Sequence, residues 1–319
     1  MAALTPAPSK QAHSTKHDTR ISVLMPTLNG AEFLPEQLES LLTQTRPPDC
    51  LLVSDDGSSD GTLACLHRFA ARAPFRVRIL RGPGRRAAAN VLSLIASAPP
   101  GALALCDQDD VWLPEKLARA RRALMGLPRE TPALYAGARI VTDRKLTQKG
   151  PVKLYPFVPD FPSSLQQNPA AGNTILLNGA AARLARSALR DLDTVPPFHD
   201  WWLCQLVLGC GGTALLDPVP QVLYRQHRHN LFGAGFGLRA GFQRFKWLLD
   251  GTYHSWVTAQ SDALFASRSR LTAPARESLQ EFRESCGRHA TPAYHSRNPW
   301  LQTALKALQA TKGARVNNR

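Results

Sequence analysis

The chain has 319 residues, 44% hydrophobic and 20% charged, which is the composition of a globular protein with a large core. Lys and Arg outnumber Asp and Glu by 39 to 24, so the net charge is +15 and favours a polyanionic partner, unless the source proteome is generally rich in Arg. The longest apolar stretch, at residues 201–210, is far shorter than the ~20 residues of a spanning helix, which excludes an integral membrane protein.

The first nineteen residues are polar and contain no apolar segment of the kind found in a secretory signal. We expect residues 1–19 to be a disordered lead and residues 20–235 to form the folded domain. The six cysteines include no Cys-x-x-Cys pair, so they predict no disulfide framework and favour a reducing compartment.

Residues 20–124 alternate short apolar runs with segments whose apolar residues recur at helical spacing. The apolar runs predict strands at 21–25, 50–53, 77–80 and 102–106, the first of them ended by Pro26. The helical spacing predicts helices at 33–45, 63–69, 87–98 and from Leu113 onward. This alternation predicts an α/β fold with a parallel sheet built from right-handed βαβ units.

After Leu124 the pattern is less regular. It predicts strands at 133–136, 171–177 and 213–216, a Pro-rich excursion at 143–169, and a helix that begins near Pro197. Apolar residues at helical spacing around Phe242, Leu264–Cys286 and Leu301 predict amphipathic helices, so we expect 236–319 to be a basic helical region. Residues 239–319 contain 13 Lys and Arg against 5 Asp and Glu.

Two acidic turns follow buried strands of the predicted sheet. Residues 54–61 carry three carboxylates, and residues 107–110 carry three more within four positions. Because the carboxyl ends of parallel strands meet at one edge, where ligands bind in open α/β sheets, we expect the two turns to lie together. One can accept hydrogen bonds from a base or ribose while the other holds a hard divalent cation, although a solvated acidic turn is the alternative for either alone.

Two further residues are candidates for chemistry. Asp200 precedes two tryptophans at the start of a predicted helix, and an apolar wall would make it a general base, with simple N-capping as the alternative. His227 lies in a Tyr-Arg-Gln-His run after a predicted strand, which favours a site over a surface histidine. The chain has no Gly-x-Gly-x-x-Gly or P-loop motif.

Five segments together resemble the sequential motifs of the inverting family-2 glycosyltransferases. They are residues 21–29, 54–60, 106–112, 199–202 and 224–230. The combination of Asp-Gln-Asp-Asp-Val-Trp, His-Asp-Trp-Trp and Tyr-Arg-Gln-His is similar to bacterial rhamnosyltransferases of cell-surface polysaccharide synthesis. The resemblance implies a GT-A fold, which is a Rossmann-like, mostly parallel sheet flanked by helices, with residues 236–319 as a C-terminal helical extension.

The resemblance also implies residue roles. Contacts to the nucleotide-sugar donor are implied for Thr27, Asn29, Asp56, Asn90, Asp107 and Asp110, with Asp56 on the nucleobase and Asp107 at the ribose. Asp109 would bind Mg²⁺ or Mn²⁺, His227 would contact the metal or the diphosphate, and Asp200 would be the catalytic base. Arg85 and Arg86 stand where relatives often have Gly, so the role of that loop stays open.

The function implied by the resemblance is metal-dependent, inverting transfer of a sugar to a lipid-linked glycan. L-rhamnose from dTDP-rhamnose is the expected donor sugar, with a UDP-hexose as the alternative. We expect a cytoplasmic protein that associates peripherally with the anionic inner face of the cytoplasmic membrane. Net charge alone also fits a nucleic-acid-binding protein, but the chain lacks the interleaved aromatics and motifs of one, and that role leaves the acidic turns unexplained, so no nucleic-acid partner is expected.

Overall fold

The computed structural model describes residues 20–150, 152, 159–227, 246–247 and 250–288. Within them, eight strands form one sheet in the order β3-β2-β1-β4-β7-β6-β8-β5. The strands β3, β2, β1 and β4 are mutually parallel, β7 is antiparallel to both of its neighbours, β6 and β8 are parallel, and β5 is antiparallel to β8. The sheet is therefore mixed and mostly parallel, and the predicted α/β fold is confirmed.

The elements of this fold have the following bounds. The strands are β1 (Ile21–Thr27), β2 (Cys50–Asp55), β3 (Arg76–Arg81), β4 (Ala102–Leu105), β5 (Val111–Trp112), β6 (Ala133–Thr142), β7 (Ile175–Leu177) and β8 (Thr213–Arg225). The helices are α1 (Leu34–Leu42), α2 (Thr62–Ala70), α3 (Arg86–Ser97), α4 (Lys116–Met125), α5 (Phe161–Gln166), α6 (Gly179–Ala188), α7 (His199–Gly209), α9 (Thr252–Ala266) and α10 (Ala273–Arg288). Three short 3₁₀ helices are η1 (Gly172–Thr174), η2 (Leu189–Asp191) and η3 (Arg268–Arg270).

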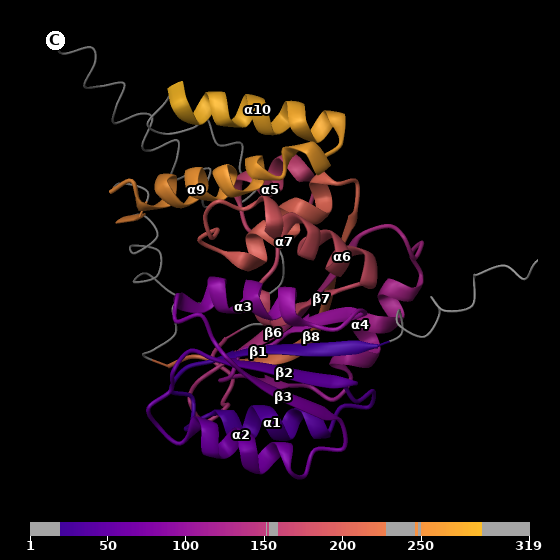
Figure 1. Ribbon diagram of the computed structural model, residues 1–319, viewed down its shortest axis with the longest axis vertical. Coiled ribbons are helices and arrows are strands. Elements are labelled where there is room, and N and C mark those ends of the chain that lie inside the picture. The colour runs from indigo at the N-terminus through magenta and orange to yellow at the C-terminus, as the bar shows by residue number, and fades with distance from the viewer. Residues whose placement is uncertain (1–19, 151, 153–158, 228–245, 248–249, 289–319) are drawn as a thin grey trace, which may run out of the picture.

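Helices cover both faces of the sheet (Figure 1). Side chains of β1 alternate between the faces: Val23 and Met25 pack with α1, α2 and α4, whereas Leu24 packs with α3, α6 and α7. Because both faces are buried, the central strands read as nearly continuous apolar runs, which is why the sequence pattern located them.

The prediction that Pro26 ends the first strand is wrong. β1 continues to Thr27, and Pro26 pairs with Ser54 of β2 in register. A proline lacks an N–H, but the position that this N–H would occupy faces the β4 side, where pairing already stops at Leu24 opposite Leu105. No ladder hydrogen bond is lost, and the strand passes through the proline unbroken.

The second half of the sheet is longer than predicted. β8 runs from Thr213 to Arg225 as one strand, and a register irregularity near Pro218 and Pro220 absorbs the two prolines. This strand carries the chain directly to His227. The helices α5 and α6 and the short strand β5 were not predicted.

The C-terminal helices lie on the side of the molecule that carries α7 (Figure 1). The side-chain amide of Gln260 in α9 receives a hydrogen bond from the Phe198 N–H and donates one to the Phe198 carbonyl, just before α7. α10 packs on α5 through apolar residues such as Leu279 and Phe161. The helices predicted around Phe242 and Leu301 lie outside the described residues, and within those residues no helix is long and apolar enough to cross a membrane.

Candidate active site

The acidic turn between β4 and β5 brings three carboxylates together. One oxygen each from Asp107, Asp109 and Asp110 lie within 4.8 Å of one another. Burial, followed by the charges of its neighbours, raises the pKa of Asp107 to about 7 and holds the pKa of Asp110 well above its usual range. A divalent cation would offset this repulsion, and an all-oxygen donor set is the kind that Mg²⁺ and Mn²⁺ take, so the residues fit the implied metal.

Asp110 lies beneath the turn with none of its surface exposed. Its Oδ2 accepts a hydrogen bond of 2.5 Å from Nδ2 of Asn173, and its Oδ1 accepts one of 3.1 Å from the backbone N–H of Arg225. Asp110 therefore ties the turn to η1 and to the end of β8, and it lies deeper than Asp109, whose side chain is 19% exposed.

His227 lies against this turn, while its contact with a metal or diphosphate stays a prediction. Its Nε2 lies 2.7 Å from Oδ2 of Asp109, although 118 residues separate the two in sequence. The imidazole stacks on Phe33 with ring centroids 4.7 Å apart and an interplanar angle of 24°. The ring is thereby oriented from below by Phe33 and directed toward the Asp109 carboxylate.

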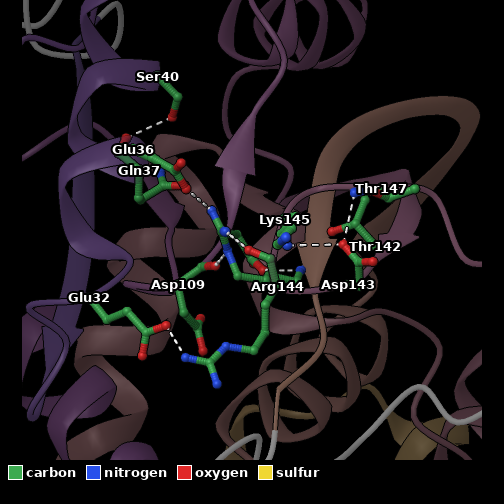
Figure 2. A network of polar contacts seen from close by, with 12 residues as sticks. Glu32, Glu36, Gln37, Ser40, Asp109, Thr142, Asp143, Arg144, Lys145 and Thr147 are labelled. Atoms are coloured by element: carbon green, nitrogen blue, oxygen red, sulfur yellow. Dashed lines mark hydrogen bonds and ion pairs between the residues drawn. The ribbon is translucent and has the colours of Figure 1, made fainter.

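Arg225 also supports the acidic turn, beside His227. The sequence analysis did not identify it as a site residue. Its guanidinium donates to the Asp109 carbonyl at 2.9 Å, to the Arg144 carbonyl and to the Glu36 carboxylate of α1, while its side chain is 2% exposed. Figure 2 shows this network, in which Arg144 also reaches Glu32 beside Asp109. The Tyr-Arg-Gln-His run could have indicated this role, because an Arg two positions before His227 lies close enough to contact the same acidic turn.

The other acidic turn, after β2, divides its carboxylates between two roles. Asp55 is buried and accepts hydrogen bonds from the Thr27 hydroxyl at 2.8 Å and from Ser58. Burial alone would raise the pKa of Asp55, but these hydrogen bonds keep the pKa below its usual value. Asp56 is partly exposed and accepts a hydrogen bond of 3.0 Å from the Gly84 N–H. Asp56 is therefore the carboxylate of the pair that faces the loop after β3.

Asn29 and Gln108 connect these two turns. Asn29 has a positive φ of 47°, and its Oδ1 accepts from the Ser59 N–H at 2.8 Å. Gln108 makes two hydrogen bonds of 3.0 Å to Leu28, accepting from its N–H and donating to its carbonyl. The segment after β1 is thus attached both to the turn after β2 and to the metal-binding candidates.

Asn90 is buried beneath the turn that follows β2 and is not on the surface of the site. It is 1% exposed in α3, and its Nδ2 donates to the Ser54 carbonyl at 2.9 Å. In this position it supports the turn that carries Asp56, and its direct contact with a donor stays a prediction.

Asp200 is the second residue of α7, whose N-cap is Phe198, so the N-cap alternative is wrong. Its Oδ1 accepts from the Trp201 N–H at 2.8 Å and its Oδ2 from the Gly172 N–H at 3.0 Å. Burial and the charge of Asp109 are the main causes that raise the pKa of Asp107, and the negative charge of Asp200 adds to them. The following tryptophans, Trp201 and Trp202, are buried in the core.

Comparison with known proteins identifies the family of this chain and several relatives. The model of the family described as glycosyl transferase family 2 matches residues 22–193. The dTDP-rhamnosyl transferase RfbG of Shigella flexneri is 25% identical over 264 residues, which cover 75% of this chain and 84% of that protein. The UDP-Glc:alpha-D-GlcNAc-diphosphoundecaprenol beta-1,3-glucosyltransferase WfgD of Escherichia coli is 27% identical over 133 residues, covering 41% of this chain and 51% of that protein.

Among solved structures, the mannosyltransferase PcManGT of Pyrobaculum calidifontis, in complex with GDP-Man and Mn²⁺, is similar with a TM-score of 0.49 and 20% identity. The match covers 92% of this chain and 75% of that one.

Proposed function

We propose that this chain, which belongs to glycosyl transferase family 2 and is therefore a glycosyltransferase that uses a nucleotide sugar, transfers L-rhamnose from dTDP-rhamnose to a lipid-linked glycan. The donor follows from the likeness to a dTDP-rhamnosyl transferase along three quarters of the chain. The acceptor class follows from the likeness to a transferase whose name specifies a diphosphoundecaprenol-linked sugar. That second relative uses UDP-Glc, so a UDP-hexose is the alternative donor.

The observation that carries the proposal is the meeting of two groups from distant parts of the chain. The adjacent residues Gly172 and Asn173 donate hydrogen bonds to Asp200 and to Asp110 of the 107–110 turn. The charge of Asp200 also contributes to raising the pKa of Asp107, although 93 residues separate the two in sequence. Glycosyl transfer needs both: a site that holds the diphosphate of the donor, and a base that faces the acceptor.

In the proposed site, Thr27, Asn29 and Asp56 lie on the nucleobase side and Asp107 lies at the ribose. The support is the geometry of the loops: Asp56 is the partly exposed member of its pair, and Asn29 holds the neighbouring segment to it. Thr27 contributes through Asp55, to which its hydroxyl donates. A loop that these hydrogen bonds preorganise binds a flat base at little cost in ordering entropy.

Asp109, with Asp107 and Asp110 around it, would hold Mg²⁺ or Mn²⁺. When bound, the ion supplies positive charge that stabilises a diphosphate leaving group. His227 is placed against Asp109, so it would orient that carboxylate or contact the diphosphate directly. Arg225 keeps the backbone of the turn fixed through the Asp109 carbonyl.

Asp200 would act as the general base. It accepts the proton of the acceptor hydroxyl as the hydroxyl oxygen forms its bond to the anomeric carbon. The bond from that carbon to the diphosphate oxygen breaks, and its electron pair leaves with the diphosphate. Because one displacement on the face opposite the leaving group inverts the anomeric centre, the site needs no second carboxylate as a nucleophile.

We further propose a cytoplasmic enzyme that associates with the anionic inner face of the membrane through the basic region 236–319. The support is the excess of Lys and Arg in residues 239–319 and the anionic character of a lipid-diphosphate acceptor. Each Lys or Arg near such a surface contributes about 1 kcal/mol.

The test is a donor screen with the purified protein and Asp200→Asn. Wild type is assayed for hydrolysis and transfer with dTDP-rhamnose, UDP-glucose and GDP-mannose in Mg²⁺ or Mn²⁺. Asp200→Asn should lower the transfer rate by about 10²- to 10⁴-fold and leave donor affinity nearly unchanged, since the amide cannot take a proton. Because an amide can accept from only one of the Trp201 and Gly172 N–H groups, the variant should also lose about 1–3 kcal/mol of unfolding free energy.

The control is Asp193→Asn, the same change at an exposed carboxylate seven residues earlier. It should retain wild-type turnover. Near-normal turnover in Asp200→Asn would disprove the base assignment, and activity with UDP-glucose but not dTDP-rhamnose would select the alternative donor.

A further inference from the structure

The 3₁₀ helix η1 lies between the candidate base and the acidic turn. Its three consecutive residues each hold a different charged side chain. Gly172 donates its N–H to Asp200, Asn173 donates its side-chain amide to Asp110, and Thr174 accepts at its carbonyl from Lys116. Nothing in the sequence motifs marks this segment, and none of its residues has been given a role above.

A side chain at Gly172 would require the neighbouring His199 ring or the η1 backbone to move. A Cβ at this position would lie 2.9 Å from Nε2 of His199 and 3.5 Å from Cβ of Asp200. The limitation is steric and does not depend on an unusual φ. The absence of a side chain lets the η1 backbone approach α7 until its N–H reaches the Asp200 carboxylate at 3.0 Å.

Asn173 is 2% exposed and faces the acidic turn. Its Nδ2 donates to Asp110 at 2.5 Å, whereas its Oδ1 is buried without a hydrogen-bond partner. The reverse orientation of the amide would put two acceptor oxygens against each other, so Asp110 fixes the amide in this direction. A buried Oδ1 without a hydrogen-bond partner lowers the stability of the fold. The Asn173 side chain is therefore not explained by stability alone, which indicates that its contact with Asp110 serves the site.

The third contact completes the arrangement. Lys116 is 1% exposed, and its Nζ lies 3.1 Å from the Thr174 carbonyl and 4.6 Å from the centre of the Trp112 ring. Immediately after Thr174 the chain enters β7, which pairs with β4 on one side and β6 on the other. The segment is thereby anchored in the sheet.

We infer that Asn173 is a positioning residue for glycosyl transfer: through Asp110 it holds the 107–110 turn in the geometry that binds a metal, while the adjacent Gly172 holds the base Asp200 at a fixed distance from that turn. The inference rests on the proposed function, because it assumes the roles given there to the acidic turn and Asp200. In this arrangement η1 sets the distance between the 107–110 turn, which would hold the donor, and Asp200, which would face the acceptor.

The experiment measures Mn²⁺ affinity directly, by electron paramagnetic resonance titration of free Mn²⁺ with and without dTDP or UDP. Asn173→Ala should weaken Mn²⁺ binding by about tenfold or more, the usual effect of removing a hydrogen-bond donor from a residue next to a metal ligand. Asn173→Asp keeps the shape of the side chain but cannot donate, so it should bind Mn²⁺ at least as weakly as Asn173→Ala.

The matched control is Asn178→Asp, the same substitution at the other end of β7. Asn178 caps α6 and accepts from the N–H groups of Ala181 and Ala133, with no contact to the acidic turn. This variant should shift the melting temperature but leave the Mn²⁺ dissociation constant within twofold of wild type. Should Asn173→Asp fail to fold, Asn173→Ala alone still decides the matter.

Gly172→Ala tests the other arm. It should lower kcat by about tenfold or more while the Mn²⁺ dissociation constant and donor KM stay near wild type, since the added Cβ forces His199 and η1 apart and disturbs the Gly172–Asp200 hydrogen bond but not the turn. Gly126→Ala, where a Cβ meets only the Ala123 carbonyl at 3.5 Å, is the control. Wild-type Mn²⁺ affinity in both Asn173 variants would overturn the inference, whereas failure of the wild type itself to bind Mn²⁺ would overturn the proposed function instead.

Discussion

Gln108 stands between two carboxylates of the acidic turn, yet its side chain points to the other half of the site. It makes two hydrogen bonds of 3.0 Å to the backbone of Leu28, which the Asp109 and Asp107 side chains do not share. In Gln108→Ala both bonds are lost, and the segment that leads to Asn29 is freed from the turn. We predict that the donor nucleotide then binds more weakly, with little change in kcat.

The magnitude follows from the two bonds. A neutral hydrogen bond contributes a net 0.5–1.5 kcal/mol, so the pair contributes about 1–3 kcal/mol, and their exposure favours the lower half of that range. Only molecules with the segment docked bind the donor well, so the apparent dissociation constant rises in inverse proportion to the fraction of molecules that remain docked. At about 1.4 kcal/mol per factor of ten, we expect a 5- to 30-fold increase.

Gly30 offers an independent route to the same result. A Cβ on Gly30 would lie 2.2 Å from Oε1 of Gln108, so Gly30→Ala should displace the amide without altering it chemically. If the reasoning is correct, Gly30→Ala and Gln108→Ala each weaken nucleotide binding in calorimetric titration, and the double variant is no weaker than the worse single variant. Fully additive effects, or a dissociation constant for Gln108→Ala equal to that of wild type, would refute it.

Three further predictions follow from other contacts. Asp109→Ala should abolish the metal dependence of donor binding, measured as the ratio of nucleotide dissociation constants in EDTA and in Mn²⁺; a wild-type ratio near one would contradict the metal site. Burial alone would raise the pKa of Asp217, but hydrogen bonds from Arg119, the Val219 N–H and Tyr135 keep this pKa below its usual value. The ionised Asp217 therefore stabilises the folded state above the unfolded-state pKa, and this contribution is lost as the pH falls through the folded-state pKa. Asp217→Asn should therefore be about 1–2 kcal/mol less stable at pH 7 in urea unfolding, and the difference should shrink as the pH falls through the folded-state pKa of Asp217, whereas a pH-independent difference would point to packing. Sedimentation with anionic vesicles should decrease between about 0.05 and 0.5 M salt, and equal binding to neutral vesicles would contradict the membrane proposal.

The strands that the sequence located share one physical property. β1, β2 and β4 are buried on both faces, so each is a run of apolar residues ended by a polar turn. The same pattern placed both acidic turns at the carboxyl ends of parallel strands, where the structure has them. These features are local, because burial acts on each residue of the strand and the turn follows within a few positions.

Features that depend on pairing between distant segments were not accessible in this way. The insertion of β7 between β4 and β6 is a matter of register and direction, which the short run at 175–177 does not specify. The effect of Pro26 on β1 could not be judged without knowing that its neighbour β4 ends earlier. The contacts of Asn173 with Asp110 and of Arg225 with Asp109 span 63 and 116 residues, and the local sequence of neither side chain specifies its partner.

The supporting groups beneath the acidic turn also explain why this edge of the sheet differs from the rest of the core. Asp110, Lys116 and Arg225 are charged residues that are almost fully buried, and burial lowers the pKa of Lys116 to about 8. Replacing such groups with apolar residues of similar volume is often neutral or stabilising, so folding alone does not account for them. Their hydrogen bonds end on the Asp109 carbonyl, on Asp110 and on η1, which are the parts that must keep fixed positions if a metal and a base are to act on one substrate. The apolar packing of the sheet offsets the cost of burying them, and the backbone of the acidic turn and the Asp110 carboxylate are held in place before any ligand arrives.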